Sequence, residues 1–411
     1  MRIAYVTDTY DDAIAGGVVT AIRFVEALRR RHDVTVLATG APAPGKVVLP
    51  GFQVPVRAMR ENHFTFAWPS HALLEPVFSC SDVVHVNFPF LLGFAAVRLA
   101  RSLGVPTVAA FHVQAENLLR SIGLHSPLLA RWVYRVWVRG FFQLADVVVC
   151  PSAFAANVLK RFGVSVPIWV VSNGIAASRL CGGRYTVPAR GGPYVLLCLG
   201  RLAREQRQEV VIDAVARCRH RGQIRLVLAG AGPLEQFLRR RAARSGLAAE
   251  IGHVSDARLE RLFAQAHLFV HASEVELEGM AVLEAMAAGL PVLVADAPDS
   301  PARRFASGPQ FLFRPGDASD LAEHLDRLLD APESLAEASG RSREQAVQHD
   351  FRRSVRSLEH IYEAIIADRG RRAAGSRDTF GVPVAARPVP IPKIAAPPEL
   401  AHETVVRSRR A

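Results

Sequence analysis

The chain has 411 residues, and 50% of them are hydrophobic, so it can bury two sizeable cores and we expect two domains. A total of 50 lysines and arginines against 38 acidic residues gives a net charge of +12, which predicts attraction to nucleic acid, an anionic membrane or a phosphorylated ligand. The five cysteines include no C-x-x-C pair, which argues against a zinc site or a disulfide framework and favours a reduced, cytoplasmic compartment.

The beginning of the chain reads as a strand. Residues 1–6 lack the apolar core and the small-residue cleavage site of a signal peptide. No apolar run reaches the length of about 18 residues that a spanning helix requires. We therefore expect any membrane contact to be at the surface.

In the first half of the chain, short β-branched runs alternate with helical patterns, which is typical of parallel α/β layers. The expected strands are 3–6, 34–38, 83–86, 107–110, 147–150 and 168–171, and the expected helices are 18–31, 91–103 and 153–162.

The alternation breaks over 176–192, which is rich in glycine and arginine, and then starts again. The second half has expected strands at 195–199, 224–229, 268–271 and 292–295, and expected helices at 208–221, 234–245, 281–288 and 354–367. This pattern predicts an α/β protein of two facing Rossmann-like domains with parallel sheets, 1–178 and 179–368, whose last helix packs back on the first domain. A basic, proline-rich tail, 369–411, is expected to be disordered.

The most informative motif spans residues 273–292. An acidic loop follows an expected strand, and Gly279 lets the backbone turn into a helix whose free amides suit a diphosphate. Glu276 lies in the loop and Glu284 about one turn into the helix, where carboxylates can bind sugar and ribose hydroxyls. Glutamates at a helix start are also ordinary capping residues, but the helix stop and new strand at 288–292 complete the unit.

This string resembles the E-x7-E signature of family-4 retaining glycosyltransferases, which have the GT-B fold and use nucleoside-diphosphate sugars. The resemblance covers about residues 1–330 and recurs, in order, at further positions. These are the glycine loop 15–20, Phe111-His112, the inter-domain loop 171–175, the strand end 199–202 and the glycine turn 228–234.

By this resemblance, the catalytic residues are His112, Arg201 and Glu276. His112 would bind the transferred sugar, Arg201 the diphosphate, Glu276 the sugar and its phosphates, and Glu284 the ribose. No Asp-x-Asp pair sits where a metal would be needed, so we expect neither a metal nor a cofactor beyond a UDP- or GDP-linked donor. The expected donor-binding residues are Gly16, Gly17, Arg201, Arg207, Gly230, Gly232, Glu276, Gly279, Met280 and Glu284.

Two positions depart from the family pattern. Gln206 stands where the family usually has a lysine, and a neutral amide cannot offset charge on a departing phosphate. Arg204 and Arg207 are the alternative sources of a compensating positive charge. Glu278 replaces a usual aromatic residue and adds a negative charge near the diphosphate. A GT-B protein that binds a sugar nucleotide or a partner without efficient catalysis is therefore an alternative.

The acceptor is expected to bind the first domain. Residues 128–142 interleave arginines with aromatic residues, and Arg131, Arg135 and Arg139 share one side of a helix with Trp132 nearby. Such a helix suits an anionic bilayer surface, although a core helix with a solvated arginine stripe fits equally. Segments 17–20 and 112–117 resemble members that glucosylate diacylglycerol lipids. The expected acceptor is thus a lipid or a glycan, reached by a protein peripheral to the inner face of the membrane.

Two other functions remain open. A sugar-nucleotide epimerase of the same architecture would release free sugar, and product analysis separates it from a transferase. Nucleic-acid binding is suggested only by charge, and the tail has one aromatic residue, Phe380, for base stacking. We therefore expect no specific nucleic-acid partner.

Overall fold

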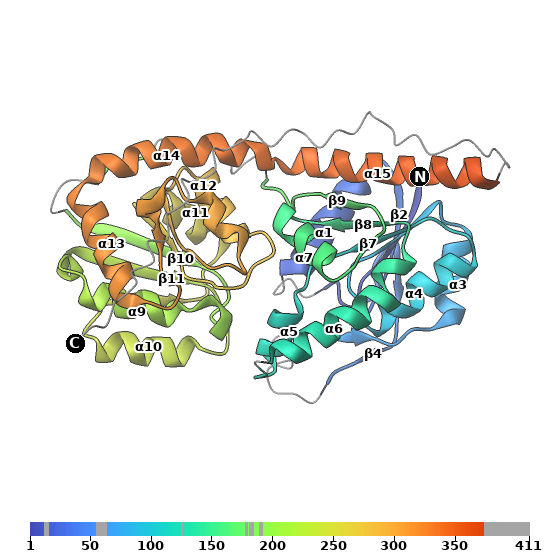
Figure 1. Cartoon of the computed structure of the whole chain (residues 1–411), viewed down its shortest axis with the longest axis horizontal. Coiled ribbons are helices and arrows are strands. Elements are labelled where there is room, and N and C mark those ends of the chain that lie inside the picture. Colours follow the sequence, from blue (N-terminus) through green and yellow to red (C-terminus); the bar gives the residue numbers. More distant parts are fainter. Residues whose placement is uncertain are drawn as a thin grey trace, which may run out of the picture. The chain divides into compact units, whose positions relative to one another are not determined.

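The computed structural model describes residues 1–11, 16–54, 64–124, 126–176, 180, 185–188 and 192–373. Residues Met1–Ala367 form one compact unit, and a second begins at Asp368. The first unit contains both α/β halves (Figure 1). Most of the predicted tail, 374–411, lies outside the described residues, but its first residues belong to a helix that runs through Ala373, so the prediction of disorder there is wrong.

The first half is built on a seven-stranded parallel sheet of order β3-β2-β1-β6-β7-β8-β9. Its central strands are apolar on both faces, and every residue of β6, β7 and β8 is buried, because helices cover both sides. The strands are β1 (Arg2–Val6), β2 (Asp33–Ala38), β3 (Lys46–Val48), β6 (Val83–Val86), β7 (Thr107–Ala110), β8 (Val147–Cys150) and β9 (Ile168–Val170), with β4 (Gly51–Phe52) and β5 (Phe66–Ala67) in a separate antiparallel pair.

The helices of this half alternate with the strands, and two of them begin at a serine cap. The Ser126 hydroxyl accepts from the Leu129 amide and the Ser152 hydroxyl from the Ala155 amide, which satisfies amides that a helix start leaves unpaired. The helices are α1 (Gly16–Leu28), α3 (His71–Ser79), α4 (Leu91–Ser102), α5 (Ala115–Ser121), α6 (Pro127–Gly140) and α7 (Ala153–Arg161).

The second half repeats the plan with a six-stranded parallel sheet of order β12-β11-β10-β13-β14-β15. The strands are β10 (Tyr194–Leu199), β11 (Ile224–Ala229), β12 (Ala249–Gly252), β13 (Leu268–His271), β14 (Val292–Ala295) and β15 (Leu312–Phe313). The helices are α9 (Gln208–Arg217), α10 (Glu235–Arg244), α11 (Asp256–Gln265), α12 (Met280–Ala287), α13 (Ala318–Asp330) and α14 (Pro332–Ala346), with a short 3-10 turn η2 (Arg204–Gln206).

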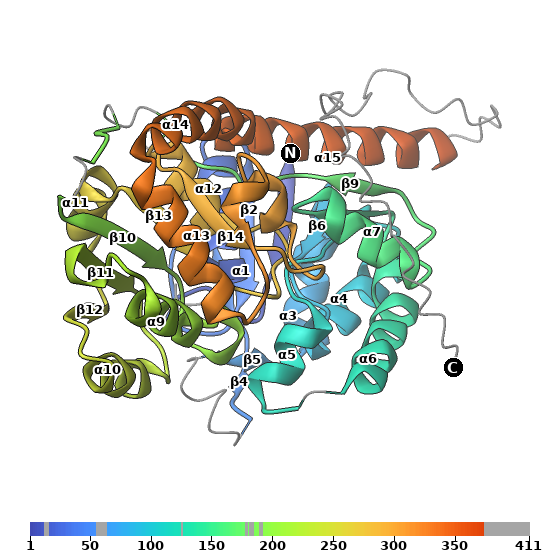
Figure 2. The same cartoon turned by 60° about the vertical axis from the view of Figure 1, so that its left-hand side comes forward.

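The last helix, α15 (Phe351–Ala373), returns to the first half (Figures 1 and 2). Its residues Leu358 and Tyr362 share a buried cluster with Ile3 and Tyr5 of β1. The Tyr362 hydroxyl also forms a 2.8 Å hydrogen bond with Nδ1 of His85 in β6. The first sheet is therefore covered on one face by the end of the described chain.

The chain crosses between the halves at one place. Ile175 donates its amide to the His349 carbonyl at 2.7 Å and accepts at its carbonyl from the Phe351 amide at 3.0 Å. A Cβ added at Gly174, whose φ is +69°, would lie 2.5 Å from Cα of Phe351. The outgoing and returning segments therefore touch backbone to backbone.

The predicted fold class is confirmed. Among the predicted elements the largest errors in bounds are at helix ends, and the helices α3, α5, α11, α13 and α14 were not predicted. The helix expected over 208–221 ends at Arg217, because Asp326 binds the Cys218 thiol and the Arg219 amide and turns the chain. The last helix begins at Phe351, three residues earlier than expected, where the Asp350 carboxylate accepts from the Arg352 amide.

Candidate donor and active site

A cavity of about 480 Å³ lies at the carboxyl ends of both sheets. In each sheet it is located where the strand order reverses, with β1 between β2 and β6, and β10 between β11 and β13. Such switch points are where open α/β sheets bind ligands. The lining residues include Gly16, Gly17, Phe88, Phe90, His112, Asn117, Leu118, Asn173, Arg201, Glu205, Gln206, Glu276, Glu278, Gly279 and Met280.

From the first half, Gly17 and His112 meet at the wall of this cavity. A Cβ added at Gly17 would lie 3.0 Å from the Phe88 ring and 3.4 Å from Cβ of His112, so the glycine permits this close packing. Burial lowers the pKa of His112 to about 4, and its imidazole is therefore neutral at physiological pH. A neutral ring offers one hydrogen-bond donor and one acceptor to a ligand.

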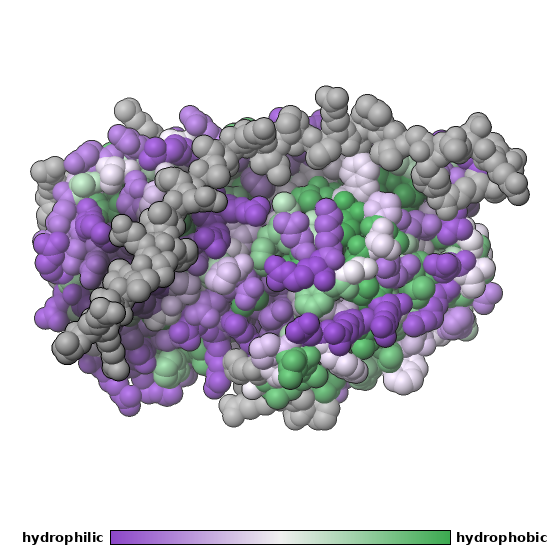
Figure 3. All heavy atoms as spheres, viewed as in Figure 1, coloured by the Kyte–Doolittle hydropathy of each residue, from purple (hydrophilic) through white to green (hydrophobic). Residues whose placement is uncertain are grey.

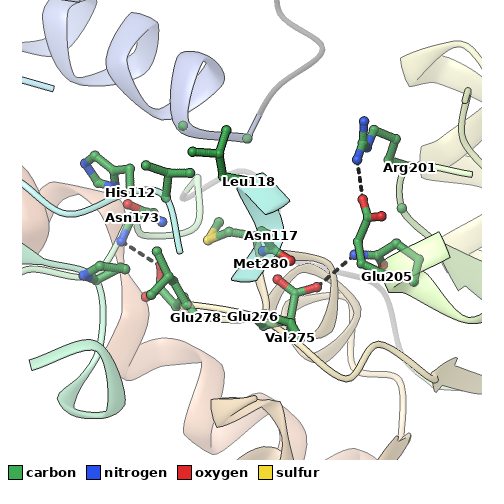
Figure 4. Close-up of a pocket in the computed structure, with 18 of the residues that line it drawn as sticks. His112, Asn117, Leu118, Asn173, Arg201, Glu205, Val275, Glu276, Glu278 and Met280 are labelled. Atoms are coloured by element: carbon green, nitrogen blue, oxygen red, sulfur yellow. Dashed lines mark hydrogen bonds and ion pairs between the residues drawn. The ribbon is translucent and has the colours of Figure 1, made fainter. Parts of the chain in front are cut away.

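From the second half, Arg201 follows β10, on the side of the cavity away from His112 in Figure 4. Its guanidinium forms an ion pair with Glu205, and its backbone carbonyl accepts from the Gln208 side-chain amide at 2.8 Å. The Arg201 side chain is 27% exposed and lines the cavity, so it remains accessible from it. Its forked donors and permanent charge suit a diphosphate.

Glu276 is held by two neighbours within the second half. Nε2 of Gln206 donates to its Oε1 at 3.0 Å, and Nε2 of His271 lies 3.5 Å from the same oxygen. Burial raises the pKa of this carboxyl, but the nearby His271 and the hydrogen bond from Gln206 outweigh it, and the net pKa is lowered. Glu276 is therefore a carboxylate at neutral pH, and Gln206 binds it directly.

Glu278 turns its carboxylate to the crossing between the halves rather than into an anion site. It accepts from the Ser172 hydroxyl and, at 3.0 Å, from the Asn173 amide, and Nδ1 of His349 lies 3.8 Å away. The side chain is 3% exposed, and burial raises its pKa to about 7. The negative charge expected beside a diphosphate is thus partly neutralised and already hydrogen-bonded.

Gly279 begins the last stretch of the site. With φ at +86° it occupies the left-handed region that favours glycine, and it starts α12 without a side-chain cap. Gly279, Met280 and Ala281 line the cavity, so this helix end presents its first amides there. Glu284, one turn further along, does not line the cavity and is partly buried.

Three other predicted donor-binding residues also lie outside the cavity wall. Cβ atoms added at Gly230 and Gly232 would lie 1.9 Å from the Gly200 carbonyl and 2.4 Å from the Leu202 carbonyl, so both glycines support the backbone beside Arg201. Arg207, in the left-handed region with φ at +55°, forms ion pairs with Glu209 and Glu274. The structure therefore brings together Gly16, Gly17, His112, Arg201, Glu276, Gly279 and Met280, and leaves Arg207, Gly230, Gly232 and Glu284 behind them.

An aromatic wall in the first half was not predicted from the sequence. Phe64 and Phe66 lie edge to face with Phe90, at centroid distances of 5.7 and 5.1 Å, and Phe88 stacks on Phe90 at 5.7 Å. All four line the cavity. The only available signal was the Phe88-Pro89-Phe90 run directly after a predicted strand.

Two searches limited to the described residues bear on other kinds of site. Within them, no three His, Cys, Asp or Glu side chains are grouped so that they could hold a metal ion. Over the same residues, no helix combines the length and apolar character needed to span a membrane.

Two family models match the chain, one on each half. The family described as "Glycosyltransferase Family 4" matches residues 14–179, and the family described as "Glycosyl transferases group 1" matches residues 186–345.

Characterised relatives and solved structures agree with these matches. An alpha-monoglucosyldiacylglycerol synthase of Streptococcus pneumoniae is 27% identical over 71% of this chain and 70% of its own length. A GDP-mannose-dependent alpha-mannosyltransferase of Mycobacterium tuberculosis is 29% identical over 80% of this chain and 87% of its own. The crystal structure of Anabaena HepE in complex with UDP superposes with a TM-score of 0.69 at 19% identity, over 89% of this chain and all of that one (100%), and so shares the fold.

Proposed function

This chain belongs to the family-4 glycosyltransferases of the GT-B fold, enzymes that use nucleotide-sugar donors, and on that premise we propose that it transfers a hexose with retention from a UDP- or GDP-linked donor to a lipid or glycan acceptor. The observation that carries the proposal is the convergence of Arg201, Glu276 and His112 on one cavity. They come from three separate segments of the chain, the ends of β10, β13 and β7.

The donor diphosphate would lie between Arg201 and the start of α12. A guanidinium and a row of helix-end amides together stabilise the charge that develops on a leaving diphosphate. Glu276, held as a carboxylate by Gln206 and His271, would accept hydrogen bonds from the sugar hydroxyls. Relatives differ in the donors their names give, so both UDP- and GDP-linked sugars stay in the proposal.

We propose retention without a covalent intermediate, and the way the carboxylates of the cavity wall are engaged supports the absence of a protein nucleophile. Among the described lining residues, Glu205 pairs with Arg201, Glu276 accepts from Gln206, and Glu278 is bound at the crossing. A covalent glycosyl intermediate requires a carboxylate aimed at the anomeric carbon. We infer instead that the leaving diphosphate takes the proton of the acceptor hydroxyl on the same face, as the C–O bond to the diphosphate breaks and the new glycosidic bond forms.

An acceptor with an apolar part is favoured by the aromatic wall. Phe64, Phe66, Phe88 and Phe90 face the same cavity as His112, so an acceptor in the first half would meet hydrophobic surface beside the reacting centre. The relative named as a monoglucosyldiacylglycerol synthase points to the same class. A lipid hydroxyl is therefore the first acceptor to test, with contact at the inner face of the membrane through α6.

One observation supports a second candidate, a sugar-nucleotide-binding protein with little or no catalysis. Gln206 brings no positive charge to the cavity, and its amide is bound to Glu276. Arg207, which might have replaced a lysine, pairs with Glu209 and Glu274 outside the cavity wall.

The test is a panel of UDP-, GDP- and ADP-linked glucose and mannose, assayed without added metal for nucleoside-diphosphate release, with and without diacylglycerol-containing vesicles. Arg201→Gln serves as the matched control, because it removes the guanidinium that would bind the diphosphate. Release that rises with acceptor, together with an α-linked product by proton NMR, supports the proposal.

Each other result favours a different function. Donor binding by thermal shift without turnover supports the non-catalytic candidate. Free sugar released without an acceptor indicates an epimerase. If no donor binds, the assignment of the donor site is wrong.

A further inference from the structure

A second cavity, of about 580 Å³, lies among three helices of the first half. Its most distinctive feature is a group of four arginines: Arg120 from α5, Arg131 and Arg135 from α6, and Arg161 at the end of α7. Leu119, Ala130 and Phe162 supply apolar wall between them. Three helices therefore bring four positive charges to the rim and walls of one hollow.

The carboxylates nearby do not balance these charges. Glu116 and Asp299 also line the cavity, but Glu116 accepts a 2.8 Å hydrogen bond from the Tyr134 hydroxyl, which fixes it to α6. Arg120 lies 3.8 Å from Glu274. Across the described part of the chain, no ion pair involves Arg131, Arg135 or Arg161. With Glu274 counted, four guanidinium groups face three carboxylates. The remaining positive charge is an excess that an anion would neutralise.

This cavity is separate from the donor site, and α5 lies between the two. Asn117 and Leu118 of α5 line the donor cavity, whereas Glu116 and Arg120 line the second. The linings share no residue. They are nevertheless connected, because the Asp299 carbonyl accepts from the Glu276 amide at 3.2 Å. A ligand in the second cavity would therefore be held close to the donor loop without entering it.

The outer face of α6 indicates where such a ligand comes from. Leu128, Trp132 and Val136 are 76%, 59% and 38% exposed, and their spacing of four residues places them in one stripe along the helix. Figure 3 shows hydrophilic side chains in a row over α6 with hydrophobic surface beside them. An exposed tryptophan and leucine next to arginines suit the interface of an anionic bilayer, where apolar side chains enter the headgroup region and cations meet phosphates.

We propose that the four-arginine cavity is a binding site for the phosphate headgroup of an anionic membrane lipid, with the exposed stripe of α6 in the bilayer interface. This proposal rests on the membrane contact proposed above and adds to it the lipid that anchors the enzyme. Guanidinium groups from three helices hold the phosphate by charge-assisted hydrogen bonds, and the α6 stripe meets the attached chains.

The experiment compares variants that remove the same charge inside and outside the cavity. Arg135→Gln is matched by Arg139→Gln, one turn further along the arginine side of α6. Arg161→Gln is matched by Lys160→Gln, the preceding residue of α7. Neither Arg139 nor Lys160 lines the cavity. Binding of the full chain to phosphatidylcholine vesicles, with and without phosphatidylglycerol, is measured by co-sedimentation without any donor. A second arm records thermal unfolding with glycerol 3-phosphate.

Where attraction to an anionic surface is diffuse, each cation removed lowers vesicle binding about five-fold. Loss of a charge-assisted hydrogen bond lowers it by about a further ten-fold. We therefore expect losses of about five-fold for Arg139→Gln and Lys160→Gln, and about fifty-fold for Arg135→Gln and Arg161→Gln. Unchanged melting temperatures and nucleotide binding in all four variants would show that the fold and donor site are intact.

Equal losses in all four variants, or wild-type binding that does not depend on phosphatidylglycerol, would overturn the proposal. A third result would also overturn it: glycerol 3-phosphate stabilises the wild type but not Arg135→Gln, while the two proteins bind vesicles equally. The cavity would then bind a soluble phosphate. Since no donor is present, a protein that transfers no sugar still gives a result. Failure of the headgroup site and failure of the transferase proposal are thus distinguished.

Discussion

Glu278 should make the stability of this protein fall as the pH rises from acid to neutral. Its carboxyl is 3% exposed, and burial raises its pKa from the ordinary 4.5 to about 7. Because the pKa is higher in the folded than in the unfolded chain, the stabilising contribution of the protonated group is complete below pH 4.5 and is lost as the pH rises through 7. At 1.36 kcal/mol for each pH unit, this difference corresponds to about 3 kcal/mol of unfolding free energy.

A Glu278→Gln variant removes this dependence without removing the acceptor for Asn173. The amide oxygen can still accept from the Asn173 amide, now 3.0 Å from the carboxylate, but the side chain cannot ionise. The melting temperature of the variant relative to wild type should therefore rise by about 4 °C between about pH 5 and about pH 8, given about 2.1 cal/mol/K of unfolding entropy for each residue of the larger unit.

The assay is differential scanning calorimetry of both proteins at matched ionic strength. Glu337→Gln is the control, since that side chain is 76% exposed and should show no pH-dependent difference of this size. A difference between Glu278→Gln and wild type that stays constant within about 1 °C over this pH range would refute the reasoning, because it would mean that burial does not shift the pKa of Glu278.

Four further predictions concern the donor site and its support. Arg201→Gln should lower kcat/KM about 100-fold or more in the nucleoside-diphosphate release assay, because a transition-state charge donor is lost; an unchanged rate would remove Arg201 from the site. Gln206→Lys should raise kcat about ten-fold by adding a cation, and a lower rate would show that its hydrogen bond to the donor loop matters more. Gly230→Ala should destabilise by about 3 kcal/mol or more in urea unfolding, because its Cβ would lie 1.9 Å from the Gly200 carbonyl; an unchanged midpoint would contradict this packing. Since the pKa of His112 is about 4, the pH–rate profile of His112→Asn should match that of wild type in shape above about pH 5.5, and loss of a wild-type inflection near pH 6.5 would contradict it.

Local pattern was sufficient to predict most of the fold. The run Val147–Cys150 is apolar at every position, and a strand buried on both faces needs this pattern. The glycine at 279, between an acidic loop and an apolar helix, likewise marked the start of α12 correctly. Such features depend on residues adjacent in sequence, so they are readable without the tertiary structure.

The contacts within the site were not readable in this way. Gln206 and Glu276 are 70 residues apart and meet only because β10 and β13 are neighbours in the sheet. Gly230 and Gly232 have the spacing of a ligand loop, but their missing side chains make room for protein backbone. The spacing of glycines indicates a close approach to the backbone, but it does not indicate whether a ligand or another part of the protein makes that approach.

Glu278 shows a further limit. Next to a predicted diphosphate site, its charge was interpreted as unfavourable, since the sequence does not reveal where a carboxylate points. In the structure its carboxylate contacts Ser172 and Asn173, which lie 106 and 105 residues earlier in the chain. The consequence for stability could be derived only after that contact was known.

The return of α15 to the first sheet sets an order of events during synthesis. The apolar side chains that close this face, including Leu358 and Tyr362, leave the ribosome about 190 residues after the first half ends near Val171, a delay of about 10–40 s at 5–20 residues per second. Throughout that interval the nascent first half exposes the hydrophobic surface around Ile3 and Tyr5. The two halves are therefore not made one after the other as independent products, because part of the apolar surface of the first is covered only after the second has been synthesised.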